Sequence, residues 1–186
     1  GLEFALKIHT NITRDHLDYH KTIEEYIRIK NSFFDDDSKK LINKDDKIVK
    51  YNSTNGFAYS LEEPSTYKVS AYSFKNGMHV MFNHFGAIHS FSSNMMGIFN
   101  VYNLMAAVAA VHITTQKPLE EICEALEGFG GVSGRMETIS ENPLIIVDFA
   151  HTPDGMKEVL QSFNERDIIC VFGAGGDRDK EKRPLM

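Results

Sequence analysis

The sequence predicts an α/β fold in two parts, and three observations support this prediction. Apolar residues recur at helical spacing after Thr22 and again after Asn100, as in amphipathic helices. Strand-sized apolar or alternating runs fill residues 47–85, which indicates a small antiparallel sheet. Apolar runs at 144–149 and 167–172 flank a helical stretch, a pattern typical of two parallel strands joined by a helix. We therefore expect one α/β domain followed by the beginning of a second.

Composition excludes several classes of protein. The chain has 186 residues, 42% of them hydrophobic and 25% charged, which is ordinary globular sequence. Its net charge of −6 argues against a partner that is a nucleic acid or an anionic membrane. We find no signal peptide and no apolar run that we judge long enough to span a bilayer. Cys123 and Cys170 lie in apolar segments, so we expect reduced core thiols in a cytoplasmic protein.

The first expected strand, residues 4–10, leads into a polar loop. Ligand sites in open α/β sheets gather at the carboxyl ends of strands, where this loop begins. The loop concentrates acidic and imidazole side chains, which suit a metal or a polar ligand but are equally common in solvated turns. Its members are Asp15, His16, Asp18 and His20.

A short helix follows the loop and carries a lysine on its apolar face. Thr22 and Glu25 have the spacing of a capping box, so the helix should begin near Thr22. Lys30 falls among the apolar positions Ile23, Tyr26, Ile27 and Phe34. Its ammonium group could reach water while its stem packs. Alternatively, burial would lower the pKa of the amine, which could then react with carbon dioxide to form a carbamate able to bind Mg²⁺ beside His16.

The middle of the chain changes from helical to strand periodicity. Residues 35–46 are interpreted as a solvated connection. Asn76-Gly77 indicates a tight hairpin turn, because a type I′ turn needs positive φ at both positions. Histidines in this region match no metal-binding spacing. The expected strands are residues 47–51, 57–61, 67–75 and 78–85.

A helix is expected after Asn100, and two asparagines stand at its opening. Asn is a favoured N-cap residue, so capping explains one of Asn100 and Asn103. A carboxamide also offers a donor beside an acceptor, which suits the edge of an adenine ring. Pro118 then opens a second helix that ends at Gly128.

The glycine-rich segment 128–134 marks a domain boundary, which divides the chain into residues 1–134 and 135–186. Arg135 follows this segment directly. In the second domain, Asp148 and His151 lie at the end of the first expected strand, and a helix is expected from about Asp154.

A glycine-rich and highly charged loop follows the second expected strand. Gly173 and Gly175 fit two positions of a dinucleotide fingerprint, but Arg178 occupies the third, where close packing needs glycine. We therefore reject a dinucleotide site. The loop is either a solvated basic turn or a site that grips carboxylates or phosphates, because the arginine fork binds these groups in two-pronged fashion.

Five motifs together resemble the Mur ligase family, in the same order and at similar spacing over nearly the whole chain. They are TNITRDHLDYH, GIFNVYN, GRMETI, VDFAHTPD and VFGAGGDRDKEKRPLM. The last two resemble the branch of the family that adds the third amino acid to the peptidoglycan precursor. The resemblance implies that residues 1–134 are the later part of a central ATPase domain and that residues 135–186 begin a Rossmann-like C-terminal domain.

The resemblance also implies roles for individual residues. Lys30, as a carbamate, and His16 would bind Mg²⁺ and serve catalysis. Arg178 would bind a carboxylate of the incoming amino acid. The nucleotide would be bound by Asn100, Asn103, Arg135, Asp148 and His151.

The implied activity is an ATP-dependent ligation in peptidoglycan synthesis. The substrates would be UDP-MurNAc-L-Ala-D-Glu and a diamino acid, either diaminopimelate or lysine, and we expect a monomer. Three alternatives remain: another Mur ligase, a folylpolyglutamate synthase-like ligase, and a non-catalytic nucleotide-binding module. The chain begins with Gly1 and contains no GxxxxGK[ST] phosphate loop. We therefore interpret it as an internal fragment that has no ligase activity by itself.

Overall fold

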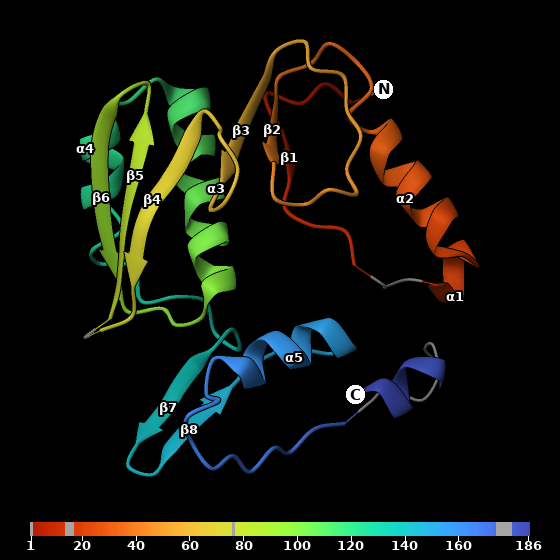
Figure 1. The fold of residues 1–186 in the computed structure, drawn as a ribbon, viewed down its shortest axis with the longest axis vertical. Helices are drawn as coiled ribbons and strands as arrows, with labels where there is room; N and C mark the ends of the chain where they lie inside the picture. The colour runs from red at the N-terminus through yellow and green to blue at the C-terminus, as the bar shows by residue number, and fades with distance from the viewer. Residues whose placement is uncertain (1, 14–16, 76, 174–179) are drawn as a thin grey trace. The chain divides into compact units, whose positions relative to one another are not determined.

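The computed structural model describes residues 2–13, 17–75, 77–173 and 180–186. It divides into two compact units, which are treated separately below. The first unit consists of residues 1–12 and 27–130, and the second of residues 13–26 and 131–186. Figure 1 traces the elements along the chain.

The first unit is built on a six-stranded mixed sheet in the order β1-β2-β3-β4-β5-β6. Strands β1 to β4 pair in parallel, whereas β4, β5 and β6 pair antiparallel. The predicted α/β class is confirmed, and the expected strands 67–75 and 78–85 correspond to β4 and β5, which pair antiparallel. The expected strand 57–61 corresponds to β3, but it pairs parallel with β2 and β4, so the antiparallel pairing predicted for it is wrong. Strand β6 was not predicted, and the antiparallel strands continue the same sheet. The strands are β1 (Lys7–His9), β2 (Lys40–Asn43), β3 (Gly56–Ser60), β4 (Tyr67–Ser73), β5 (Met78–His84) and β6 (Ala87–Ser93).

Two strand predictions in this unit are wrong. Lys40–Asn43, expected to be solvated, is the fully buried strand β2. The charged residue Lys40 makes this strand look like a solvated segment in the sequence. In the structure its ammonium group donates to the carbonyl oxygens of Asp36 (2.6 Å) and Thr54 (3.0 Å), and these hydrogen bonds allow it to be buried. Residues 47–51, expected to be a strand, are turn and coil.

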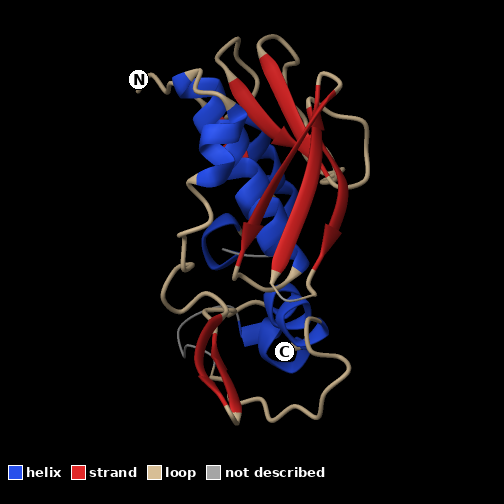
Figure 2. Ribbon diagram, turned by 90° about the vertical axis from the view of Figure 1, so that its left-hand side faces the viewer, coloured by secondary structure: helices blue, strands red, loops and turns tan. Residues whose placement is uncertain are grey.

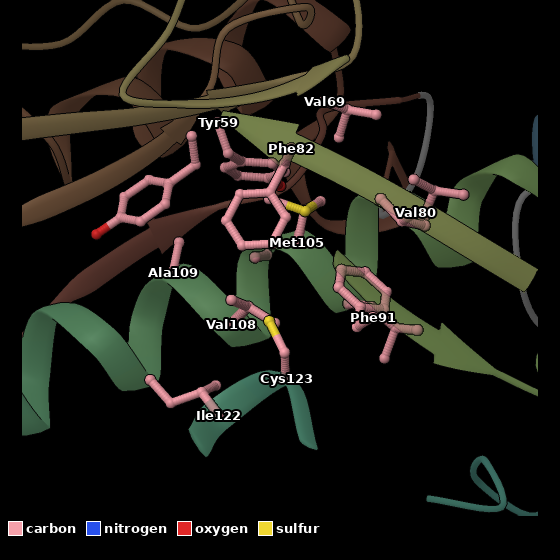
Figure 3. Close-up of a cluster of buried hydrophobic side chains, with 14 of the residues drawn as sticks. Tyr59, Val69, Val80, Phe82, Phe91, Met105, Val108, Ala109, Ile122 and Cys123 are labelled. Carbon is pink, nitrogen blue, oxygen red and sulfur yellow. The ribbon is translucent and has the colours of Figure 1, made fainter. Parts of the chain in front are cut away.

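Two helices cover one face of this sheet (Figure 2). They are α3 (Ile98–Thr115) and α4 (Leu119–Glu124). Their side chains meet those of β3 to β6 in a single core, part of which is shown in Figure 3. Cys123 is a buried free thiol in this core, as predicted, and its burial raises the pKa to about 11.

Helix α3 overturns one prediction from composition. By length and apolar content alone, its 18 residues could cross a membrane, so the expectation that no run is long enough is wrong. Its buried side chains, however, pack into the core described above. The core helix of a globular domain has these same properties.

The second unit contains a two-stranded antiparallel sheet and helix α5 (Pro153–Gln161). Strand β7 (Glu137–Glu141) pairs with β8 (Leu144–Val147), which is the first strand predicted for this domain. Helix α5 is confirmed, and the side chain of its N-cap residue Thr152 accepts from Gly155 N at 3.1 Å. The unit also contains α1 (Leu17–His20), the first four residues of α2 (Ile23–Ser32) and a 3₁₀ helix (Lys180–Leu185).

The second predicted strand of this domain, residues 167–172, is not formed. These residues are coil, and the side chains of Ile169 and Val171 are 95% and 93% exposed. A strand forms only when a neighbouring strand satisfies its backbone groups, and none of the described residues supplies one here. For the same reason Cys170 is exposed, so the prediction of a core thiol at this position is wrong.

Candidate functional site

The beginning of the polar loop after β1 is held by the last residue of β2 and by a residue of the turn that follows β2. Asp46 Oδ2 accepts from the backbone nitrogen of Ile12 at 2.7 Å and lies 2.9 Å from His9 Nε2. Asn43 Nδ2 donates to the carbonyl oxygen of Thr10 at 2.8 Å. The sheet therefore fixes the point from which residues 11–20 depart. His16, predicted to bind metal, lies outside the described residues.

Helix α2 has the predicted cap, but Lys30 is not buried in its apolar face. Thr22 Oγ1 accepts from Glu25 N at 3.2 Å, which confirms the predicted start. Tyr26 and Phe34 are buried, whereas Lys30 is exposed. Lys30 lies one helical turn after Tyr26, yet its side chain is exposed. The burial that the carbamate hypothesis supposes for Lys30 is therefore not found among the described residues.

The end of α2 is fixed by a buried lysine on β1. Lys7 Nζ donates to the carbonyl oxygen of Phe33 at 2.7 Å and pairs with Asp36 Oδ2 at 2.6 Å. The hydrogen bond from Lys7 is the largest cause that lowers the pKa of Asp36 to about 2. The stretch that carries Lys30 is thus attached to the sheet at both ends, by Asp46 and Asn43 before it and by Lys7 after it.

A second aspartate in the same turn attaches α3 to the β3–β4 connection. Asp45 accepts from the backbone nitrogens of residues 61, 62 and 63, and Tyr102 Oη donates to it at 3.0 Å. Burial alone would raise the pKa of Asp45, but these hydrogen bonds outweigh it and the pKa is lowered. Asp45 therefore remains ionised and holds the helix that carries the asparagine pair.

The two asparagines of α3 are in contact, and neither caps the helix. The N-cap residue is Gly97, with φ of 88°, so α3 begins before the predicted Asn100 and the capping explanation is wrong. Asn100 is 2% exposed and donates to the carbonyl oxygen of Met96 at 2.7 Å. Asn103 Nδ2 donates to Asn100 Oδ1 at 3.1 Å and is itself exposed. Asn103 is thus the member of the pair that reaches the surface.

Three predicted nucleotide-binding residues lie together in the second unit. Asp148 accepts from the backbone nitrogens of Met136 (2.8 Å) and Ala150 (2.7 Å), which joins the segment after Arg135 to the end of β8. The Arg135 guanidinium lies 4.6 Å from the centroid of the Phe149 ring, and the rings of Phe149 and His151 are 5.0 Å apart. The structure therefore assembles a small cluster of one cation, one carboxylate and two rings at the carboxyl end of β8.

This cluster adjoins an apolar groove of about 890 Å³ in the same unit. Asp148, Phe149 and His151 are among its lining residues, and α5 contributes Met156 and Leu160. Residues 166–173 also line the groove. Arg178, predicted to bind the amino acid, lies outside the described residues.

The described residues do not complete a metal site. No group of three or more His, Cys, Asp or Glu side chains in this part of the chain could hold a metal ion. Lys30 alone, as a carbamate, would supply one ligand group, and its predicted companion His16 is among the residues not described.

Models of two protein-family domains match the chain. The model of the Mur ligase middle domain matches residues 1–111, and the model of the Mur ligase glutamate ligase domain matches residues 134–186.

The chain belongs to the Mur ligase family.

Similar Mur ligases cover the chain from end to end. A protein of Wolinella succinogenes named UDP-N-acetylmuramoyl-L-alanyl-D-glutamate--2,6-diaminopimelate ligase is 55% identical over all 186 residues, which span 43% of that relative. A protein of Helicobacter hepaticus with the same name is 50% identical over the whole chain and 42% of its own length. The chain thus spans less than half the length of these Mur ligases.

Solved structures agree with this membership. A structure of UDP-N-acetylmuramoyl-L-alanyl-D-glutamate--2,6-diaminopimelate ligase matches 97% of the chain and 40% of its own, with 31% identity and a TM-score of 0.70. A pseudomurein peptide ligase type C from Methanothermus fervidus matches 85% of the chain and 41% of its own, with 27% identity and a TM-score of 0.75.

The sequence prediction missed most of the residues that support the site of this Mur ligase chain. Asp45 and Asp46 were assigned to a solvated connection, because acidic pairs are common in exposed turns. A signal was nevertheless present: Asn43, Asp45 and Asp46 directly follow an apolar pair, a position at which a strand end is expected. Phe149 and Glu137 carried no such signal, since their partners become visible only in three dimensions.

Proposed function

We propose that the chain is part of an ATP-dependent ligase of peptidoglycan precursor synthesis, which adds the third amino acid to UDP-MurNAc-L-Ala-D-Glu. One observation carries the proposal: the 55% identity over the whole chain with a relative named as the diaminopimelate ligase. The names of the relatives favour diaminopimelate over lysine as the added amino acid. We further propose a cytoplasmic monomer that acts without membrane or nucleic acid.

The proposed reaction has two steps. The terminal carboxylate of the precursor attacks the γ-phosphorus of ATP, which forms an acyl phosphate and releases ADP. The amine of the third amino acid then attacks the acyl carbon, and inorganic phosphate leaves as the amine loses a proton. Such chemistry depends mainly on positioning and on stabilising charge, because the reacting groups are highly anionic.

The residues of the chain have distinct proposed tasks in this reaction. Asn103 would present its carboxamide to the adenine edge, held in place by Asn100, to which it donates at 3.1 Å. Arg135 would grip phosphate oxygens, and Asp148 would accept from a ribose hydroxyl group beside His151. The two oxygens of Asp148 already accept backbone hydrogen bonds, but a carboxylate has further lone pairs for a ligand.

Mg²⁺ is proposed as the cofactor on the resemblance of Lys30 and His16 to the metal-binding residues of the family. When bound, the ion would neutralise phosphate charge.

A hybrid enzyme tests the proposed function. Residues 1–186 replace the matching stretch of the Wolinella succinogenes relative, which supplies the remaining 57% of that protein's length. This hybrid ligase should release ADP and form amide product only when the UDP-MurNAc dipeptide and diaminopimelate are both present. A hybrid that folds but joins folate to glutamate, or that ligates no acid to any amine, would refute the proposal. The 186-residue chain alone should show no turnover.

A first prediction concerns the incoming amino acid. Arg178→Ala in the hybrid ligase should raise the KM for diaminopimelate about tenfold, because the two-pronged hydrogen bond to a carboxylate is lost. The KM for ATP should change by no more than about twofold, since the lost contact is made to diaminopimelate and not to ATP. Steady-state kinetics with each substrate varied in turn measures both values. An equal rise in the two KM values would argue for a structural role, and Arg183→Ala serves as the matched control.

A further inference from the structure

Residues 132–137 form a closed turn around Arg135, in which three consecutive backbone N–H groups each have an acceptor. Gly134 N donates to Glu137 Oε2 at 2.7 Å, and Arg135 N donates to the carbonyl oxygen of Val132 at 3.0 Å. Met136 N donates to Asp148 Oδ2 at 2.8 Å. The backbone is therefore held before, at and after Arg135, and two of the three acceptors are carboxylates.

Glu137 is the carboxylate of this pair that has no role in the proposed site. Its Oε2 also accepts from Ser133 Oγ at 2.9 Å. The bond from Gly134 N, and then the bond from Ser133, lower the pKa of Glu137 and keep it ionised at neutral pH. Glu137 is the first residue of β7, so it connects the turn to a hydrogen-bonded strand.

The turn needs such an anchor because the segment before it is rich in glycine. Four of the seven residues 128–134 are glycine, and Gly131 and Gly134 have φ of 90° and 69°. Glycine loses more backbone entropy on ordering than any other residue. By accepting from Gly134 N, Glu137 fixes the last glycine of this segment, one residue before Arg135.

The side chain of Arg135 is oriented as well. Its guanidinium lies over the Phe149 ring at 4.6 Å, so one face of the guanidinium is covered. The guanidinium makes no hydrogen bond within the residues that the structure describes, and the edge N–H groups remain available. An arginine with a covered face and open edges is suited to a phosphate, which binds in the plane of the fork.

We propose that Glu137 is a positioning residue for nucleotide binding: it acts through the turn at Ser133–Gly134 to hold Arg135 where it can meet the phosphates of ATP. This proposal rests on the proposed function only for the identity of the ligand. The fixing of the turn is a property of the 186-residue chain itself.

The first test measures the turn directly in the 186-residue chain. Amide hydrogen exchange at Gly134 should become about tenfold faster in Glu137→Ala, because the acceptor of that N–H is lost. Glu137→Gln, which keeps a carbonyl acceptor, should show a smaller increase. The matched control is Glu141→Ala at the other end of β7, which should leave exchange at Gly134 unchanged. Unchanged exchange in Glu137→Ala would overturn the proposal.

The second test is a double-mutant cycle on ATP binding by the hybrid ligase, measured by calorimetry. Glu137→Ala should weaken the Kd for ATP roughly three- to tenfold, the size expected when one ordinary intramolecular hydrogen bond is lost. Glu137→Gln should recover most of this loss. In an Arg135→Gln background, Glu137→Ala should weaken ATP binding no further, because its effect passes through Arg135.

The outcomes separate this proposal from the proposed function. An effect of Glu137→Ala that persists in full in the Arg135→Gln background, or that weakens diaminopimelate binding equally, would show general destabilisation and overturn the positioning role. If the hybrid binds ATP but ligates nothing, the proposed function fails while the cycle still decides the role of Glu137. If the folded hybrid binds no ATP, both proposals fail.

Discussion

Lys30→Ala in the hybrid ligase should lower the rate of ligation about a thousandfold, which corresponds to roughly 4 kcal/mol of lost transition-state stabilisation. The proposed reason is chemical: an uncharged amine at Lys30 would add to carbon dioxide and lose a proton, and the two oxygens of the resulting carbamate, which share one negative charge, would bind Mg²⁺. Alanine offers none. Initial rates of phosphate release at saturating substrates measure the loss.

Two further variants distinguish a carbamate from a cation at this position. Lys30→Arg keeps the positive charge but should be as inactive as Lys30→Ala, because a guanidinium is not a nucleophile at neutral pH. Short carboxylic acids should partly restore Lys30→Ala, and ¹³C-bicarbonate should label the parent enzyme but not the variant. Arg28→Ala, an exposed change on the same helix, is the matched control and should retain activity. Full activity of Lys30→Ala would sink the carbamate hypothesis.

The exposure of Lys30 bears on where the carbamate would be stabilised. In the described part of the chain, the side chain of Lys30 is exposed, whereas Tyr26 on the same helix is buried. We expect the metal and its other ligands to favour the carbamate, so labelling by ¹³C-bicarbonate should be stronger with Mg²⁺ and ATP present.

Asp46→Ala should destabilise the first unit of the 186-residue chain by about 3 kcal/mol, since removing one partner of a buried pair leaves the other unsatisfied. The side chains of His9 and Asp46 are 4% and 9% exposed, and Asp46 also holds the backbone of Ile12. Hydrogen exchange of the β2 amides as a function of urea reports on this unit alone. Asp35→Ala, an exposed aspartate, is the control and should be nearly neutral. Equal stabilities of the two variants would show that the Asp46 contacts contribute nothing.

Asp46 should also make the stability of the first unit depend on pH in the acid range. Burial alone would raise the pKa of Asp46, but the hydrogen bonds from His9 and from the backbone of Ile48 and Ile12 outweigh it and lower the pKa. A carboxyl group with a lowered folded-state pKa stabilises the fold above its unfolded pKa, here 3.8. This stabilisation is lost as the pH falls from 3.8 through the lower folded value. Asp46→Ala should therefore flatten the dependence of stability on pH in this range.

Periodicity predicted the helices and the antiparallel pair of β4 and β5, because those elements bury one regular face. It failed where one side chain contradicts its surroundings. Lys40 and the acidic pair after it made β2 resemble a solvated loop, although two carbonyl oxygens satisfy its ammonium group. At residues 167–172 it predicted a strand that is not formed. These residues are apolar, but no described strand pairs with them.

In the candidate site, too, some residues could be predicted from the sequence and others could not. Arg135, Asp148 and His151 were predicted from motifs, and the structure brings them together around Phe149. The residues that hold them could not be predicted, because a carboxylate such as Glu137 acquires its role only from the backbone N–H group that faces it. Asn100 shows a further limit: the motif identifies the pair, but only the structure shows that Asn103 is the exposed member.

The burial of Lys40 and Lys7 should make these two lysines less reactive than the exposed lysines of the chain. Lys40 is fully enclosed, and Lys7 is 8% exposed, with its ammonium between a carbonyl and a carboxylate oxygen. An acylating reagent reacts only with a lysine nitrogen that it can reach and that carries no proton. Both buried lysines should therefore escape labelling in the folded chain and react only after unfolding. Acylation at Lys40 would thus report the opening of the sheet, and it would do so in a mixture or a cell extract where spectroscopy cannot.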